Sequence, residues 1–390
     1  MDLTKLSAFL ANGSIPRTPL PIDVHYLNGF KWNTIVSYNA AVKKFMKFKA
    51  EKEELPFTLP VTAEDIYQFC FWAGRNEFQQ TTQEVKATTI EKYLYGIQAW
   101  HEYHSTQYPK QRCHRDDTIR YQAFICIVSE LEYPKIPDLC CLTFLRHIHE
   151  SKTKVGTLLK SSAKVDAQVP TKPNKAAVHL KHLLILVEAL SGKGEKEEAI
   201  KDLVVTAFWG MARMAELTYG NESGPIPRAS SLLTSDVSPT QPDQRGGVMT
   251  LSLRNAKTCA PGETQEIQLR KLGMKLCPLE AVGRRLANAK GVTTSLFGFQ
   301  ANGKRQHLTR NVVVTTIKKV WTNNNLEGLS GHSFRVGGAS LRAAMGVPVE
   351  EICSLGRWTS NCYKLYLRPY SLAEVAESKA LLRRLTDGSR

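Results

Sequence analysis

Apolar residues recur at three- and four-residue steps through most of this chain, and this pattern constrains the fold more than any other feature. Between residues 35 and 48 the apolar positions are Ile35, Tyr38, Val42, Phe45 and Phe48. Such spacing is typical of an amphipathic α-helix. Strict alternation, which is typical of strands, occurs in two short runs, 249–253 and 267–269, on either side of the turn-forming Ala260-Pro261-Gly262. We therefore expect a mainly helical fold with one small β-hairpin.

A chain of 390 residues is too long for one ordinary core, so we expect two domains. An N-terminal extension, 1–24, precedes a helical domain over 25–150. Its helices are expected to begin near Asn33-Thr34, after the N-cap Thr62 and at Thr88-Thr89, with others at Thr118–Leu131 and Leu142–His149.

The composition changes between Ser151 and Lys175, where six lysines lie among Ser, Thr, Gly and Pro. We interpret this segment as a basic linker, which either lies against phosphates or is simply solvated. A second domain is expected over 176–370, with helices that include Pro278–Ala289 and Ser360–Leu367. The pair Gly337-Gly338 would allow a neighbour to pack closely on one helix. A C-terminal helix, Leu372–Leu385, lies in the tail 371–390. It could dock on a neighbouring subunit or pack on its own.

Lys and Arg outnumber Asp and Glu by 52 to 36, a formal charge of +16. This excess favours a polyanionic partner, with nucleic acid as the first candidate. Lys43, Lys44 and Lys47 would form a basic face on the first long helix. No run of about 18 apolar residues and no signal-like start is found, so we expect an intracellular protein that does not enter membranes. The nine cysteines form no CxxC pair, so we expect reduced thiols and no zinc site.

Three short motifs near the C-terminus carry the strongest functional signal. They are Gly331-His332-Ser333-Phe334-Arg335, then Leu355-Gly356-Arg357-Trp358, then Tyr363-Lys364-Leu365-Tyr366. A His and an Arg three residues apart at a helix start share one face, near free backbone amides. Such a position binds anions.

Taken together, these motifs resemble the C-terminal signature of the tyrosine recombinases, in particular the Crypton and DIRS-type recombinases of eukaryotic mobile elements. The upstream motif 210–217 matches the family's first arginine at Arg213, with an acidic residue, Glu216, three places on. The turn 255–258 matches the family's lysine at Lys257. The remaining matches are His332, Arg335, Trp358 at the position held by His or Trp, and Tyr366 as the nucleophile.

The resemblance implies a transesterification on DNA. Two guanidiniums, Arg213 and Arg335, would donate in forked pairs to the non-bridging oxygens of a phosphodiester. His332 would add a donor, and Lys257 would protonate the departing 5′ oxygen. Trp358 would position the site or donate its indole N–H. Glu216 either orients Arg213 or is an ordinary surface acid. Arg357 is a further candidate DNA contact, and Tyr363 is the alternative nucleophile.

The resemblance also implies a clamp of a SAM-like core-binding domain and an α+β catalytic domain on double-stranded DNA. A homotetramer would form at synapsis, with a monomer or dimer otherwise, in the nucleus. No P-loop or acidic metal cluster is evident, so we expect no cofactor or metal. Three alternatives stay open: a catalytically silent DNA-binding regulator, a type IB topoisomerase-like enzyme, and a small-molecule enzyme or RNA-binding protein.

Overall fold

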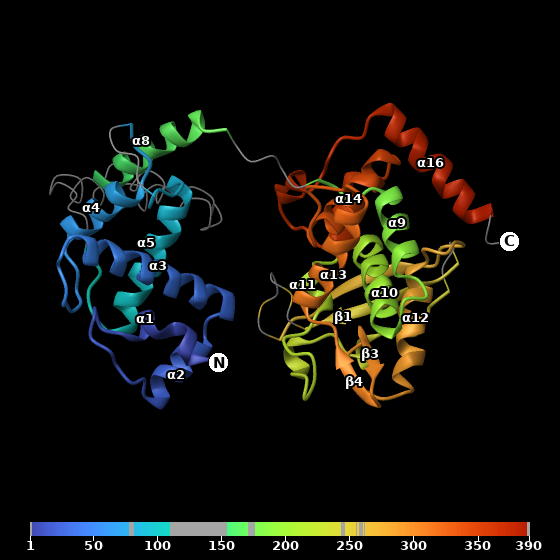
Figure 1. Ribbon diagram of the computed structural model, residues 1–390, viewed down its shortest axis with the longest axis horizontal. Coiled ribbons are helices and arrows are strands. Elements are labelled where there is room, and N and C mark those ends of the chain that lie inside the picture. Colours follow the sequence, from blue (N-terminus) through green and yellow to red (C-terminus); the bar gives the residue numbers. More distant parts are fainter. Residues whose placement is uncertain are drawn as a thin grey trace, which may run out of the picture. The chain divides into compact units, whose positions relative to one another are not determined.

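The computed structural model describes residues 2–77, 82–109, 154–170, 176–242, 246–254, 256, 260 and 262–387. The chain divides into two compact units, Met1–Lys172 and Pro173–Arg390 (Figure 1). The helices expected at Thr118–Leu131 and Leu142–His149 lie outside the described residues. In the part of the chain that is described, no helix has the length and apolarity that a bilayer crossing requires.

The described part of the first unit is helical. Its elements are η1 (Leu3–Leu6), α1 (Ser7–Leu10), α2 (Pro21–Asn28), α3 (Trp32–Glu51), α4 (Ala63–Ala73), α5 (Ala87–Tyr103) and α8 (Lys154–Gln168). Helix α4 begins at the predicted N-cap Thr62, which forms a capping box with Asp65. Helices α3 and α5 pack together around Phe45 and Trp100, both fully buried.

Two expectations for the first unit are wrong. Residues 3–10 are not a free extension, because Leu6, Phe9 and Leu10 are buried in the same core. The supposed linker forms α8 over most of its length, and this helix packs on α4 and α5. The reason is that Val155, Leu158 and Leu159 recur at helical spacing beneath the lysine- and serine-rich surface, so the helix has an apolar stripe to bury.

The second unit combines helices with two antiparallel hairpins. Its helices are α9 (Leu180–Leu190), α10 (Glu195–Trp209), α11 (Met214–Leu217), α12 (Pro278–Ala289), α13 (Arg310–Asn323), α14 (Ser333–Ala344), α15 (Val349–Gly356) and α16 (Leu372–Asp387), with the 3-10 helices η2 (Arg228–Ser230), η3 (Thr234–Asp236) and η4 (Asn361–Leu365). The strands are β1 (Val248–Leu253), β2 (Gln265–Arg270), β3 (Gly298–Ala301) and β4 (Lys304–His307).

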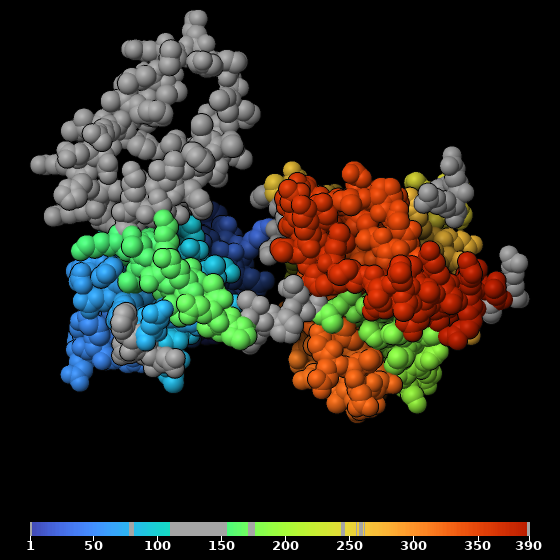
Figure 2. All heavy atoms as spheres, turned by 90° about the horizontal axis from the view of Figure 1, so that it is seen from above, coloured from blue at the N-terminus to red at the C-terminus, as the bar shows by residue number. Residues whose placement is uncertain are grey.

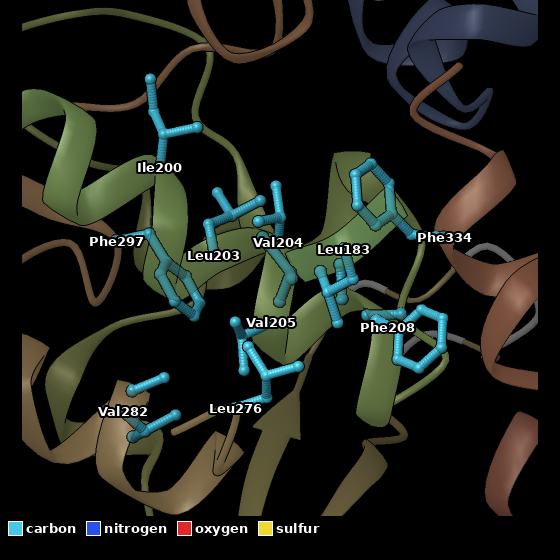
Figure 3. Packing of buried hydrophobic residues seen from close by; sticks show 14 of the residues in the cluster. Leu183, Ile200, Leu203, Val204, Val205, Phe208, Leu276, Val282, Phe297 and Phe334 are labelled. Carbon is cyan, nitrogen blue, oxygen red and sulfur yellow. The ribbon is translucent and has the colours of Figure 1, made fainter. Parts of the chain in front are cut away.

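Helix α10 lies at the centre of this unit. It packs against α9, α12, α14 and β3, and its residues from Ala199 to Phe208 are buried almost without interruption. A helix that is apolar on all sides is stable only when it is surrounded. Figure 3 shows its side chains between Phe297 and Val282 on one side and Leu183 and Phe334 on the other. This core holds the segments of the candidate site.

The Gly337-Gly338 pair explains how closely α14 approaches α10. A Cβ at Gly338 would lie 2.1 Å from the Phe208 carbonyl oxygen, and one at Gly337 would lie 2.0 Å from that of Val178. Only glycine fits at these positions, which agrees with the prediction of close packing. The contact fixes the helix that carries His332 and Arg335 against the central core.

The hairpin β1–β2 forms as predicted, with Leu251 opposite Ile267. Two further features differ from the prediction. The hairpin β3–β4 was not expected. The segment expected as a helix over Ser360–Leu367 forms only the short 3-10 helix η4.

The C-terminal helix α16 packs on α9 of the same chain. Leu381 and Leu385 enter the core of the second unit, and Lys181 Nζ pairs with Glu377 at 2.9 Å. Figure 2 shows α16 in red along the surface of this unit, beside the light green of α9. This helix was expected either to dock on a neighbouring subunit or to pack on its own, and in the structure it packs on its own chain.

Candidate active site

Arg335 is the centre of the candidate site. Its side chain is fully buried on α14, one turn after the N-cap His332. Its two terminal nitrogens donate to the carbonyl oxygens of Met211 and Gly356. The guanidinium therefore joins the turn after α10 to the end of α15, which are far apart in sequence.

Two aromatic rings lie against this guanidinium, and a third ring contacts one of them. Its carbon lies 4.5 Å from the ring centroid of Trp358 and 5.3 Å from that of Tyr366. The Tyr366 ring lies 4.8 Å from the Trp358 ring and 5.0 Å from the His332 ring, centroid to centroid. Trp358 is buried, Tyr366 is half-buried and His332 is exposed. The structure thus brings four of the predicted site residues together.

Arg213 and Glu216 form the second part of the site. Arg213 is the N-cap of α11, and its backbone N–H donates to Glu216 Oε2 at 2.8 Å. Its Nη1 donates to Glu216 Oε1 at 2.6 Å. Arg357 Nη2 donates to the same carboxylate at 2.6 Å from the other side. Glu216 is not a surface acid, because its side chain is only 7% exposed. Of the two roles considered for Glu216, the structure therefore favours the one in which it orients Arg213.

The electrostatics of the site are those of a cationic cluster around one carboxylate. Burial lowers the pKa of Arg335 to about 10, and the positive charges of Arg213 and Arg357 act in the same direction. Burial alone would raise the pKa of Glu216, but Arg357 and Arg213 outweigh it and hold that pKa below its ordinary value. The cluster has three positive charges, from Arg213, Arg335 and Arg357, and one negative charge, from Glu216. It therefore attracts an anion.

The backbone next to Arg335 has an unusual conformation at Met211 and at Arg357, and it requires glycine at position 356. Met211 is fully buried with a φ of +44°, and this left-handed turn accompanies the carbonyl that receives Arg335. A Cβ at Gly356 would lie 2.1 Å from the Trp358 ring, so glycine is required for the indole to lie there. Arg357 follows with a φ of +59° and ends α15.

The placement of Arg335 differs in one respect from the expected fork of open donors. Aromatic rings cover the guanidinium, and each of its terminal nitrogens donates to a backbone carbonyl instead of being open to a ligand. Among the described residues, several buried donors have no hydrogen-bond partner, and two of them, Arg335 Nε and Trp358 Nε1, lie in this site. Such donors are uncommon in proteins. They are the kind of group that an anionic oxygen stabilises.

The other predicted residues lie as follows. Lys257 lies outside the described residues. Tyr363 is half-buried and packs in the small cluster with Trp358 and Tyr366. Arg357 is 7% exposed and paired with Glu216, and its contact with DNA stays a prediction.

The three lysines predicted to form a basic face on α3 differ in exposure. Lys43 and Lys47 are exposed, and Lys47 lies 3.8 Å from Glu51. Lys44 is half-buried, and its Nζ lies 4.9 Å from the Trp72 ring centroid and donates to Gln83. This differs from an open cation, because the ammonium group lies over the face of the Trp72 ring and is hydrogen-bonded to Gln83.

Sequence reasoning missed the contributions of Met211, Gly356 and Ser340. The first two act through backbone carbonyls, which side-chain motifs do not reveal. Ser340 lies in the run Gly337-Gly338-Ala339-Ser340, where small residues already had an explanation in packing. Only its position one and a half turns after Arg335 on α14 could have drawn attention to it.

No family model matches this chain, and no curated protein is similar to it in sequence. Solved structures are similar to it in fold. The XerH site-specific recombinase bound to palindromic difH substrate, in a post-cleavage complex, has a TM-score of 0.50 at 11% identity, over 97% of this chain and 93% of that one. The Tn1549 transposon integrase in complex with transposon right end DNA has a TM-score of 0.47 at 12% identity, over 93% and 97%. A lambda integrase dimer bound to a COC′ core site has a TM-score of 0.42 at 12% identity, over 90% and 93%. The predicted fold class is confirmed: the chain has the mainly helical fold of the two-domain tyrosine recombinases.

Proposed function

We propose that this chain is a site-specific DNA recombinase that cuts and rejoins duplex DNA through a covalent bond between Tyr366 and a 3′ phosphate. The observation that carries the proposal is the position of Tyr366, whose ring lies against both the guanidinium of Arg335 and the ring of His332, with Trp358 beside it. Arg213 lies close enough to that guanidinium to affect its pKa. A chance set of motifs would not be expected to meet at one point of the fold.

The reaction follows from these groups. The phenol oxygen of Tyr366 attacks the phosphorus, its proton passes to a base such as His332, and the bond from phosphorus to the 5′ oxygen breaks. Lys257 gives a proton to that oxygen. A 5′ hydroxyl from another duplex then attacks the phosphotyrosine and releases Tyr366. One phosphoester replaces another, so the exchange needs no nucleotide hydrolysis.

Stabilisation of the phosphate charge falls to the arginines. The phosphorane-like transition state gains negative charge on its non-bridging oxygens, and fixed cations stabilise it more than the ground state. Arg213 is partly exposed and already oriented by Glu216, so it is suited to direct contact. Arg335 would contribute through its Nε and its buried charge, with Trp358 Nε1 beside it.

Double-stranded DNA is the partner that this chemistry requires, and the net charge of +16 favours it. The XerH site-specific recombinase, which is similar in fold, was solved bound to its difH substrate. We further propose a homotetramer at synapsis, a monomer or dimer otherwise, and action in the nucleus on a mobile element, as the Crypton- and DIRS-like motifs imply.

A pool of nicked duplexes with a randomised central sequence tests the proposal. The nick lets the short fragment that carries the freed 5′ hydroxyl diffuse away, so the covalent adduct accumulates. We expect adducts that survive denaturation with the unaltered protein and none with Tyr366→Phe, and sequencing of the trapped DNA gives the site. Adduct that persists in Tyr366→Phe but is lost in Tyr363→Phe would identify Tyr363 as the nucleophile. Tight duplex binding with no adduct would indicate a silent regulator.

A second assay separates recombination from relaxation. Two duplexes that carry the recovered site and different end labels are incubated together, and recombinant products are resolved on a gel. We expect products with exchanged ends. Relaxation of a supercoiled plasmid without any exchanged product would instead assign the topoisomerase-like activity.

A further inference from the structure

Ser340 links the helix that carries His332 and Arg335 to the backbone of the proposed nucleophile. Its side chain is fully buried on α14. Its hydroxyl donates to the carbonyl oxygen of Tyr366 at 3.3 Å and accepts from the backbone N–H of Arg368 at 2.9 Å. A single hydroxyl thus holds two backbone groups on either side of Leu367.

The hydrogen-bond acceptor of the Ser340 hydroxyl is not the usual one for a serine within a helix. A serine within a helix commonly bonds back to the carbonyl four residues earlier. Ser340 instead donates to Tyr366, 26 residues later in the chain. The bond therefore joins two separate segments of the site.

The segment that carries Tyr366 has little regular structure of its own. Tyr366 follows the five-residue 3-10 helix η4, with its N–H bonded to the Tyr363 carbonyl at 2.8 Å. Leu365 next to it is 72% exposed. Short 3-10 helices have poor hydrogen-bond geometry, so contacts with other elements must determine where the phenol lies.

Helix α14, in contrast, is fixed firmly. Gly337 and Gly338 place it against α10, and Arg335 bonds to the turn at Met211. An anchor from this helix to Tyr366 therefore sets the nucleophile relative to His332 and Arg335, because all three depend on one rigid element.

We propose that Ser340 is a positioning residue for the nucleophile, which holds the Tyr366 backbone so that the phenol oxygen reaches the phosphorus in line. This inference rests on the proposed function. It assigns to Ser340 an effect on the cleavage step and none on DNA binding, since the buried hydroxyl has no access to a duplex. A misplacement of about 1 Å can lower the rate of a reaction about 100-fold.

Single-turnover adduct formation on the nicked site tests this role. We expect Ser340→Ala to slow adduct formation by about 10- to 100-fold. Its Kd for the same duplex, measured by gel shift, should stay within about twofold of that of the unaltered protein. Ser340→Thr keeps the hydroxyl and should recover most of the rate. All rates are measured well below each variant's melting temperature.

A matched control is available in the same unit. Thr206 is also fully buried, but its hydroxyl donates to the Asp202 carbonyl within α10. Thr206→Val removes a buried hydroxyl without touching the Tyr366 segment, so its adduct rate should equal that of the unaltered protein.

A substrate with sulfur as the 5′ bridging atom separates alignment from proton donation. Sulfur leaves without a proton, so it rescues a defect in the general acid. We expect no rescue of Ser340→Ala, because a misplaced phenol remains misplaced.

The outcomes separate the inference from the proposed function. Three outcomes would overturn the role of Ser340. In the first, Ser340→Ala forms adduct as fast as the unaltered protein. In the second, its loss of rate is matched by an equal loss of binding, and in the third, Ser340→Thr does not recover the rate. In each case the adduct of the unaltered protein would still support recombination. Absence of adduct in the unaltered protein would overturn the proposed function itself.

Discussion

Arg357 and Glu216 form an ion pair at 2.6 Å across 141 residues of the chain, and each side chain is only 7% exposed. The same carboxylate receives Arg213 at 2.6 Å. Glu216 therefore holds two arginines from different elements beside Arg335. Removing one partner of a buried pair is costly because the remaining charges are left without compensation.

We expect Glu216→Gln to lower the free energy of unfolding by about 3 kcal/mol at neutral pH. The sign of its pH dependence follows from the pKa of Glu216, which lies below its ordinary value of 4.5. The unfolded chain then binds more protons than the folded one, so the stabilisation is present above pH 4.5 and is lost as the pH falls through the lower folded pKa.

Thermal melts of both proteins between about pH 3 and about pH 7 measure this effect. The difference in Tm between the unaltered protein and Glu216→Gln should shrink toward acid pH. A difference that stays constant, or grows, would show that the carboxylate is not the stabilising group.

Arg335→Lys tests the forked geometry at the centre of the site. A lysine has a single ammonium group in place of the planar guanidinium. It cannot reproduce both the donors to the Met211 and Gly356 carbonyls and the additional N–H at Nε. We expect adduct formation to fall about 100-fold or more, the usual effect of losing one preorganised donor.

The matched control for this change is Arg342→Lys on the same helix. Arg342 is half-buried and donates to the carbonyl oxygens of Gly338 and Trp209, outside the site. It should lose stability while its adduct rate, measured below the melting temperature, is unchanged. Equal losses of rate in both variants would mean that α14 packing, and not Arg335, determines the rate.

Gly338→Ala tests the approach of α14 to α10. Its new methyl group would lie 2.1 Å from the Phe208 carbonyl oxygen, so the helices must separate, and we expect a loss of about 1–3 kcal/mol. Gly283→Ala on α12 is the control, since nothing lies within 4 Å of its Cβ. There alanine should stabilise the helix by about 0.5–1 kcal/mol. Urea denaturation gives both values, and a neutral Gly338→Ala would contradict the packing.

The buried acid Asp202 supports the core behind the site. It is fully buried and pairs with Arg284 and with Arg285 Nε at 2.7 Å. Asp202→Asn leaves Arg285, which is 4% exposed, without its counter-charge. We expect a loss of about 3–5 kcal/mol. Glu377→Gln, which removes an exposed pair with Lys181, should cost less than about 1 kcal/mol. Similar losses in urea denaturation would contradict the difference in burial.

Local patterns were enough to predict much of this fold. The hairpin β1–β2 and helices such as α12 follow from side-chain periodicity, which acts over a few residues. The hairpin β3–β4 was overlooked although Asn302-Gly303, with both φ values positive, is a recognised turn signal. Its four-residue strands are too short and too polar to show alternation. Helix α8 was obscured because its lysines dominate the composition.

The candidate site was predicted as a set of residues, but its geometry was not. The pairing of Arg357 with Glu216 depends on a left-handed residue at the end of α15 and on packing between distant segments. The burial of Arg335 under Trp358 and Tyr366 depends equally on tertiary structure. Neither has a local sequence signal, because each arises only when the core around α10 has formed.

The identity of the covalently bound residue tests the central claim most directly. The adduct trapped on the nicked duplex is digested with nuclease and protease, and the nucleotide-bearing peptide is sequenced by mass spectrometry. The account predicts a single modified residue, Tyr366, with the nucleotide attached through its 3′ phosphate. A nucleotide on Tyr363 or on any other residue, or attachment through a 5′ phosphate, would contradict it.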